Sequence, residues 1–317
     1  MPVPAAGLGY IRFHLRNATD GILLESKRPE NLAVSVPEPR EIRALFKILI
    51  SRGARRVRLM GEDPANRKDL VDLVTMLAGM SGISWVALST GGTALNGRID
   101  DLAKAGLRGV NFHLDTLRPD RFAGGGHDSE HAAVCQAIDA CLDAGLTVKL
   151  NAVLERGWNL DEMNDFLKLT ATRPISVRFV EWNVEQDRLP SPENFVPSWE
   201  AMAAIEHHLE PVEPSANSGP AIVFRIPGHE GSVGFIPNVT EHFCADCHRV
   251  GLTDAGEIVS CIFGRGLDVL RHLRSENGVS DAETFIDRVI RRKTSLAAKL
   301  AGWDAAPMLT ASPTPPL

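Results

Sequence analysis

The stretch RVRLMGEDPANRKDLVDLVTMLAGMSGISWVALS, residues 56–89, decides the fold of this chain. It contains a short apolar strand pattern at 56–60, a helical pattern at 69–80 and a second strand pattern at 85–89. Two strands joined through a helix form a βαβ unit, in which both strands lie parallel in one sheet. The stretch therefore predicts a parallel sheet that is covered by helices.

The same alternation extends in both directions along the first part of the chain. Further strand patterns lie at 8–15, 109–114, 147–153 and 176–181, and further helical patterns at 38–52, 98–105, 131–144 and 160–171. Six strands that alternate with helices predict an α/β fold, an open or partial (β/α)6 barrel. Ligands of such sheets bind beyond the C-terminal ends of the strands. The polar residues at those ends either bind a ligand or shape turns; they are residues 61–64 and 89–92, His113, Asp115, Asn151, Glu181 and Trp182.

Beyond residue 185 the pattern changes. A Pro-rich linker precedes a helical pattern at 199–208, a hairpin pattern at 221–226 and 232–236, and helical patterns at 267–273 and 282–300. We therefore expect a barrel over residues 1–185, an α+β region over 186–300 and a disordered tail over 301–317.

The α+β region contains a candidate metal site in the stretch FCADCHRVGLTDAGEIVSCIF, residues 243–263, where Cys244, Cys247 and Cys261 form a C-x2-C-x13-C pattern. Two thiols three residues apart can reach one metal, and a third thiol follows after a stretch long enough to form a hairpin. A structural disulfide would not need three thiols. Zinc would take a fourth ligand, for which His242 and His248 are close enough. An iron–sulfur cluster accepts three cysteines and leaves one iron open. Spacing alone favours zinc.

Composition excludes several classes of protein. The 317 residues carry a net charge of −6, so no broad basic surface for nucleic acid is expected. Five cysteines, of which three are clustered, fit a reducing compartment better than a disulfide framework. The N-terminus does not have the pattern of a signal peptide, and no apolar run approaches the ~18 residues of a membrane span. We expect a soluble, cytoplasmic protein without a membrane partner.

Several motifs, together with the cysteine stretch, resemble the molybdenum-cofactor GTP 3′,8-cyclases (MoaA) of the radical SAM superfamily. They are VRLMGEDPANRKDL, VALSTGGTAL, VNFHLDTLRPDRF, VKLNAVLERGWNLDE and VRFVEW. The likeness covers nearly the whole chain. It implies that Cys244, Cys247 and Cys261 match the ligands of the family's C-terminal [4Fe–4S] cluster, whose open iron contacts the purine of GTP. The resemblance therefore favours iron–sulfur over zinc.

The sequence departs from the family where the family binds its other cluster. Members carry a C-x3-C-x2-C motif after the first strand, and those positions here are Thr19, Leu23 and Ser26. No cysteine precedes Cys135. Because an iron–sulfur cluster needs thiolate ligands, we expect this cluster to be absent and S-adenosylmethionine (SAM) not to be cleaved.

Other family positions have changed while basic ones remain. Gly91, His113, Asn183 and Gly251 differ from the family, and Gly251 removes a phosphate-binding arginine. The resemblance leaves a remnant of a SAM site and a set of residues for a GTP-like anion, since guanidinium groups bind phosphate bidentately. The SAM-site remnant is Gly61, Asp63, Thr90 and Asn151, and the anion-binding set is Arg12, Arg67, Lys149, Arg178 and Arg249. No catalytic residue is predicted.

Three functions follow as hypotheses. The favoured one is a pseudoenzyme that binds a nucleotide-like or phosphorylated small molecule, or a partner that is a paralogous cyclase or a second copy of the chain. The second is an enzyme that uses the open iron of the C-terminal cluster as a Lewis acid without radical chemistry. The third is a scaffold in which the cysteines hold zinc structurally.

Overall fold

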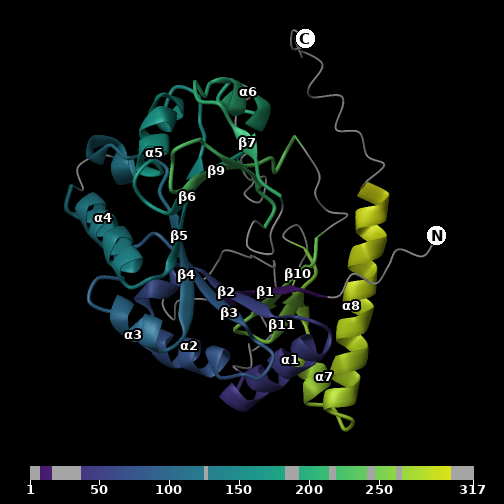
Figure 1. Cartoon of the computed structure of the whole chain (residues 1–317). Helices are drawn as coiled ribbons and strands as arrows, with labels where there is room; N and C mark the ends of the chain where they lie inside the picture. The colour runs from purple at the N-terminus through teal and green to yellow at the C-terminus, as the bar shows by residue number, and fades with distance from the viewer. Residues whose placement is uncertain are drawn as a thin grey trace.

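In the described part of the computed structural model, twelve strands form one sheet (Figure 1). The structure describes residues 8–15, 37–124, 128–182, 193–213, 219–240, 247–261 and 266–300. The strands at its centre pair in parallel in chain order. They are β1 (Tyr10–Leu15), β2 (Arg56–Gly61), β3 (Trp85–Thr90), β4 (Leu107–His113), β5 (Thr147–Val153) and β6 (Ile175–Val180). The predicted α/β fold with a partial barrel is confirmed.

Helices cover the outer face of this curved sheet (Figure 1). Phe13 on β1, for example, packs edge-on against Phe46 with ring centroids 5.2 Å apart. Both side chains are fully buried, and burial of a Phe stabilises the fold by roughly 2–3 kcal/mol. The covering helices are α1 (Pro39–Ser51), α2 (Leu70–Ala78), α3 (Ile99–Lys104), α4 (Asp128–Asp143) and α5 (Met163–Leu169), and short 3-10 turns lie at Pro64–Asn66, Pro119–Gly124 and Leu160–Glu162.

The C-terminal part of the chain extends both edges of the same sheet. Strand β9 (Ser232–Ile236) pairs in parallel with β6, and β10 (Arg249–Thr253) pairs in parallel with β1. Beyond β9 the antiparallel strands β8 (Ile222–Arg225) and β7 (Glu210–Pro211) follow, so the predicted hairpin at 221–236 is present. Beyond β10 lie β11 (Glu257–Val259) and β12 (Leu267–Asp268).

The C-terminal helices differ in extent from their predicted ranges. Helix α6 (Ser198–Ala203) ends earlier than expected, and residues 267–268 form a strand rather than helix. The reason for the second difference is tertiary, because β12 pairs with β11 and the Val269 and Leu270 amides donate to the Gly256 carbonyl. Helices α7 (Leu270–Leu273) and α8 (Val279–Leu300) follow. Within the described ranges, no helix is long and apolar enough to cross a membrane.

Candidate functional site

The candidate site lies on the concave face of the sheet, opposite the helices. Successive side chains of a strand point to opposite faces. On β1, Ile11, Phe13 and Leu15 are buried against the helices, so Tyr10 and Arg12 belong to the concave face. The parallel register places Arg58 of β2 beside Arg12, on the same face. Lys149 of β5 lies on this face too, beside Ser176 of the neighbouring strand β6.

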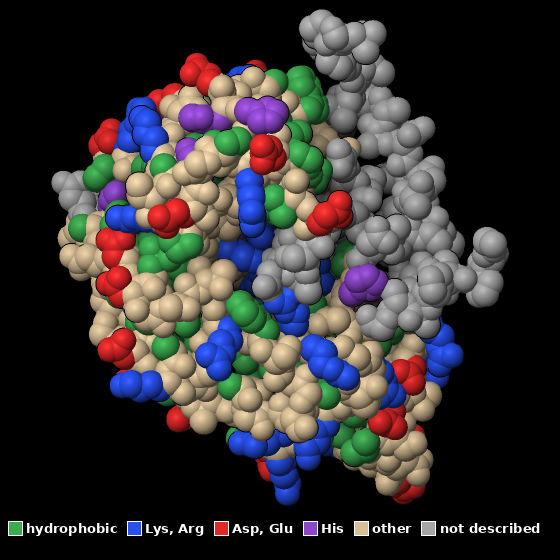
Figure 2. Space-filling view, in the orientation of Figure 1, with side chains coloured by type: hydrophobic (Ala, Val, Ile, Leu, Met, Phe, Trp, Pro, Cys, Tyr) green, Lys and Arg blue, Asp and Glu red, His purple; other side chains and the backbone are tan. Residues whose placement is uncertain are grey.

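Basic side chains crowd this face. Figure 2 shows Lys and Arg side chains gathered around the hollow at the centre of the molecule. By strand register and burial they include Arg12, Arg56, Arg58, Lys149, Arg178 and Arg249. The structure thus brings together four predicted residues, and Arg56 and Arg58 were missed. The signal for both was present, because they alternate with the buried Val57 and Leu59.

Crowding and burial change the protonation of this cluster. Lys149 is only 8% exposed, and burial, followed by the charges of Arg178, Arg58 and Arg56, lowers its pKa to about 6. Burial is also the main cause that lowers the pKa of Arg178 to about 10. Arg178 remains a cation at neutral pH, whereas the Lys149 amine is mostly neutral.

Aromatic and amide groups orient the arginines of β2. The Arg58 guanidinium lies over the Tyr10 ring, 5.5 Å from its centroid, and the Arg56 guanidinium lies 5.3 Å from the Trp85 ring. With its amide oxygen turned toward β2, Asn111 accepts hydrogen bonds from both terminal nitrogens of Arg58 at 2.9 Å. Within the described part of the chain, Tyr10 Oη and Arg58 Nε are buried without a hydrogen-bond partner. These two donors are available to an acceptor atom of a ligand.

Two imidazoles also belong to the concave face. Burial, followed by the charge of Arg12, lowers the pKa of His14 to about 4, against the opposing effect of Asp254. Burial and Arg58 likewise lower the pKa of His113, although its side chain keeps an accessible surface. A side chain that is enclosed by protein and still accessible lines a hollow. The sequence analysis did not predict His14. Its side chain lies close to β10, since a Cβ atom added at Gly251 would be 3.4 Å from His14 Nε2.

The predicted SAM-site remnant forms an interlocked turn. Asp63 accepts hydrogen bonds from Thr90 Oγ1 at 2.5 Å and from the Gly91 amide at 3.1 Å, which ties the end of β2 to the end of β3. Thr90 Oγ1 in turn accepts from the Gly92 amide at 2.9 Å. Asn151, the fourth member, lies instead on the concave face, in register with His113 and Arg178. The turn-shaping interpretation therefore describes Asp63 and Thr90, and a ligand role for them stays a prediction.

Arg67 lies in the loop after β2, outside the strands that carry the basic cluster. It donates to Asp69 through Nε at 2.8 Å and through a terminal nitrogen at 2.7 Å, and its other terminal nitrogen lies 3.6 Å from Asp254. Asp254 follows β10, so this ion pair joins the loop after β2 to the C-terminal edge of the sheet. Its predicted contact with an anionic ligand remains untested.

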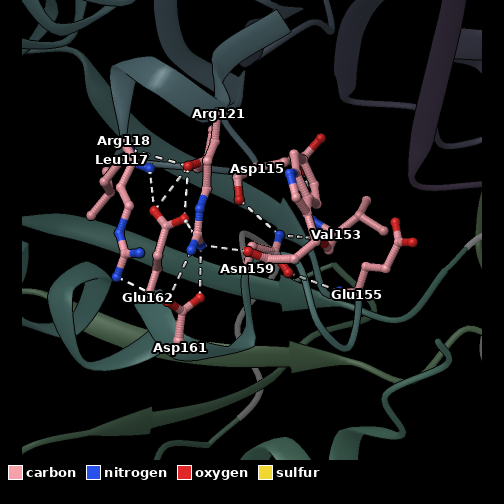
Figure 3. A network of polar contacts seen from close by, with 11 residues as sticks. Asp115, Leu117, Arg118, Arg121, Val153, Glu155, Asn159, Asp161 and Glu162 are labelled. Carbon is pink, nitrogen blue, oxygen red and sulfur yellow. Dashed lines mark hydrogen bonds and ion pairs between the residues drawn. The ribbon is translucent and has the colours of Figure 1, made fainter. Parts of the chain in front are cut away.

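A second polar network stabilises the loops after β4 and β5 (Figure 3). Asn159 is buried and donates to the Asp115 carbonyl at 2.8 Å and to the Val153 carbonyl at 2.7 Å. Asp115 Oδ1 accepts from the Val153 amide at 2.7 Å, and burial raises the Asp115 pKa. Glu162 is fully buried and accepts from Arg121 at 3.0 Å. Asp115, a candidate at a strand end, therefore shapes these loops.

Glu181, another candidate at a strand end, also forms hydrogen bonds that stabilise the fold. Its carboxylate accepts from the Ser198 amide at 2.7 Å, the Val239 amide at 2.8 Å and the Thr240 amide at 2.9 Å. The Thr240 hydroxyl adds a contact of 2.5 Å. Because Ser198 begins α6 and Thr240 precedes the cysteine stretch, Glu181 holds both segments to the end of β6.

Two of the three cysteines of the predicted metal site lie within the described residues. Cys247 lies two residues before β10 and Cys261 two residues after β11, so both flank the open end of one hairpin. Both side chains are partly exposed. Cys244 and His242 lie outside the described residues, as do Thr19, Leu23, Ser26, Asn183 and the tail from residue 301. Cys141 is buried and Cys135 is half-buried.

Comparisons with known proteins agree with this architecture. Residues 26–170 match the model of the radical SAM superfamily, and residues 175–298 match that of Molybdenum Cofactor Synthesis C. A GTP 3′,8-cyclase of Pelotomaculum thermopropionicum is 37% identical over 83% of this chain and 83% of its own length. A GTP 3′,8-cyclase of Moorella thermoacetica is 36% identical with the same coverage.

A solved structure shares the fold at low sequence identity. The crystal structure of Streptococcus suis SuiB bound to S-adenosylmethionine matches with a TM-score of 0.54 at 10% identity. The match covers 87% of this chain and 65% of that one. At this identity the likeness concerns the fold alone.

Proposed function

Because the chain belongs to the family of GTP 3′,8-cyclases, within the radical SAM superfamily, we propose that it binds a phosphate-bearing, nucleotide-like ligand on its concave face but has lost the family's radical chemistry. The observation that carries the proposal is the cluster of Arg12, Arg58, Lys149, Arg178 and Arg249 on one hollow face. Arginines in a partly buried hollow bind phosphate oxygens through charge-assisted hydrogen bonds.

Two donors that have no hydrogen-bond partner among the described residues support the same proposal. Tyr10 Oη and Arg58 Nε are both buried, and a buried donor without an acceptor costs roughly 1–3 kcal/mol. A ligand that offers acceptor oxygens would remove that cost. The relatives' names give GTP as their substrate, so GTP is the natural first probe.

Loss of radical chemistry follows from the donor atoms at the family's first cluster. Thr19, Leu23 and Ser26 offer at most two hydroxyl groups, and no cysteine precedes Cys135. Hydroxyl groups do not replace thiolates on a soft iron cluster. These residues do not fit the cluster that would bind and reduce SAM, so no step of that kind is assigned to this protein.

For the cysteine stretch we propose a [4Fe–4S] cluster held by Cys244, Cys247 and Cys261, with structural zinc as the alternative. When bound, such a cluster supplies one iron that is open to a ligand, and this iron could act as a Lewis acid. Anaerobic reconstitution should give a brown protein that absorbs near about 400 nm, and Cys261→Ala should lose the colour while Cys135→Ala keeps it. A colourless protein that retains one zinc would favour the structural alternative.

Calorimetry with GTP tests the proposed ligand class. We expect binding that weakens roughly tenfold or more in Arg178→Leu, because a charge-assisted contact is lost. Arg173→Leu is the matched control, since Arg173 pairs with Asp139 on the outer surface and should leave the affinity unchanged. If wild-type protein binds neither GTP nor inorganic pyrophosphate, or if Arg178→Leu binds as tightly as wild type, the proposal is wrong.

A further inference from the structure

Two histidines from separate segments of the C-terminal part of the chain meet at the surface. His207 follows α6, and His229 lies in the turn that joins β8 to β9. Their rings lie edge-on to each other, with centroids 5.6 Å apart. His207 is exposed and His229 partly exposed, and Figure 2 shows histidine side chains at the top of the view, where Figure 1 places α6 and β7. Ile205 and Leu209, on either side of His207, pack against the hydrophobic core, which fixes the segment that carries it.

The turn that carries His229 is held in place by its backbone. The His229 amide donates to the Ile226 carbonyl at 3.0 Å, and the Gly231 amide donates to the Thr170 carbonyl at 2.9 Å. A Cβ atom added at Gly231 would lie 2.2 Å from the Ile175 carbonyl oxygen, so the turn packs directly onto the start of β6. The His229 ring is therefore attached to a part of the chain that is already fixed before any ligand binds.

A hydrogen bond to Thr170 orients the His229 ring. Thr170 Oγ1 donates to the Leu167 carbonyl at 2.8 Å and lies 2.7 Å from His229 Nδ1. A hydroxyl group has one proton and a carbonyl oxygen can only accept, so Thr170 accepts the proton that His229 carries on Nδ1. This assignment leaves a lone pair on His229 Nε2. Histidines that bind metals have this arrangement, in which one ring nitrogen donates to the protein and the other binds the metal.

We propose that His207 and His229 form a site for a divalent transition-metal ion such as Zn²⁺ or Ni²⁺, with Thr170 as its positioning residue. Imidazole suits these ions, and in zinc sites the ring nitrogen lies about 2.0–2.1 Å from the metal, which requires two rings as close as these. Within the described ranges no group of three or more His, Cys, Asp and Glu side chains could hold a metal, so water would complete the coordination. The ion would join the segment after α6 to the turn between β8 and β9. The site uses neither the cysteines nor the concave face and does not depend on the proposed function.

Calorimetric titration of the untagged protein with NiCl2 tests the site. Wild-type protein should bind an Ni²⁺ ion that His207→Gln and His229→Gln each lose, because glutamine offers no imidazole nitrogen. His208→Gln is the matched control, since His208 is the exposed neighbour of His207 and should keep this ion. Any nickel that binds at the cysteine stretch is common to wild type and all three variants, so it cancels in the comparison.

Variants of Thr170 test the orientation of the His229 ring. Thr170→Val removes the acceptor of the Nδ1 proton and should weaken Ni²⁺ binding roughly tenfold, and Thr170→Ser should restore the wild-type affinity. Because Thr170 is fully buried, chemical denaturation establishes that each variant is folded. A purely structural role would lower the free energy of unfolding and leave the affinity of the folded protein for Ni²⁺ unchanged, which would overturn the role of Thr170.

The stability of the protein gives a second measurement. Addition of Ni²⁺ should raise the denaturation midpoint of wild type more than that of His229→Gln, since an ion that binds only the folded state stabilises it. Equal rises in both proteins contradict the site. Nickel that binds equally to wild type, His207→Gln and His229→Gln is an adventitious ion only and overturns the proposal. A loss in His208→Gln as large as that in His207→Gln, or no binding to wild type at all, also overturns it.

Discussion

Gly61 is the residue at which backbone geometry most constrains the chain. Its φ is +123°, and a Cβ built there would lie 2.1 Å from the Leu15 carbonyl oxygen. Gly61→Ala should therefore cost more than ~3 kcal/mol or prevent folding, because the strained backbone and the collision add together. Gly97→Ala is the matched control, since φ there is +77° with nothing within 4 Å, and should cost only about 1 kcal/mol. Urea unfolding measures both. Equal losses would contradict the account.

Lys149 gives a second prediction at the scale of one residue, for the protein without ligand. The pKa of Lys149 is about 6 when folded and about 10.5 when unfolded, so between these values the unfolded chain binds one more proton. The free energy of unfolding should therefore rise with pH relative to Lys149→Met, by roughly 1 kcal/mol per pH unit between about pH 7 and pH 9. Chemical denaturation at several pH values measures this difference. A difference that does not change with pH, as expected for Lys168→Met, would show that Lys149 is charged when folded.

At the scale of elements, Glu181 fastens α6 and the segment before the cysteines to the end of β6. Glu181→Gln replaces one acceptor oxygen by an NH2 group that faces backbone donors. We expect a loss of roughly 2–4 kcal/mol in unfolding free energy, because buried donors are left without an acceptor. Glu210→Gln, in an exposed edge strand, should cost less than about 0.5 kcal/mol. A fully stable Glu181→Gln would mean that the carboxylate serves a ligand rather than the fold.

The elements of the barrel could be predicted because their pattern is local. The alternation of Arg56 and Arg58 with Val57 and Leu59 specifies both a strand and its two faces. The turn at Asp63 and Thr90 could not be predicted, since its bonds join residues 27 positions apart. Likewise, nothing local indicates that 267–268 pairs with β11 instead of starting a helix.

At the scale of the whole molecule, the sequence predicted the parallel centre of the sheet but not its edges. The patterns at β9 and β10 indicate hairpin arms, and each strand does pair antiparallel with its hairpin partner. Each also pairs in parallel on its other side, β9 with β6 and β10 with β1. This second pairing carries Arg249 onto the concave face next to Tyr10, and so completes the basic cluster. Such long-range pairing leaves no trace in the local pattern.

The central claim is that a chain of this family keeps the anion-binding face and has lost the radical-generating centre. The most direct measurement is anaerobic reconstitution with iron, sulfide and dithionite, followed by chromatography for 5′-deoxyadenosine after addition of SAM. No product above a protein-free control is expected, because Thr19, Leu23 and Ser26 provide no thiolate. Formation of 5′-deoxyadenosine that depends on the protein, and that is lost when Thr19 and Ser26 are changed to Ala with Cys244 intact, would contradict it.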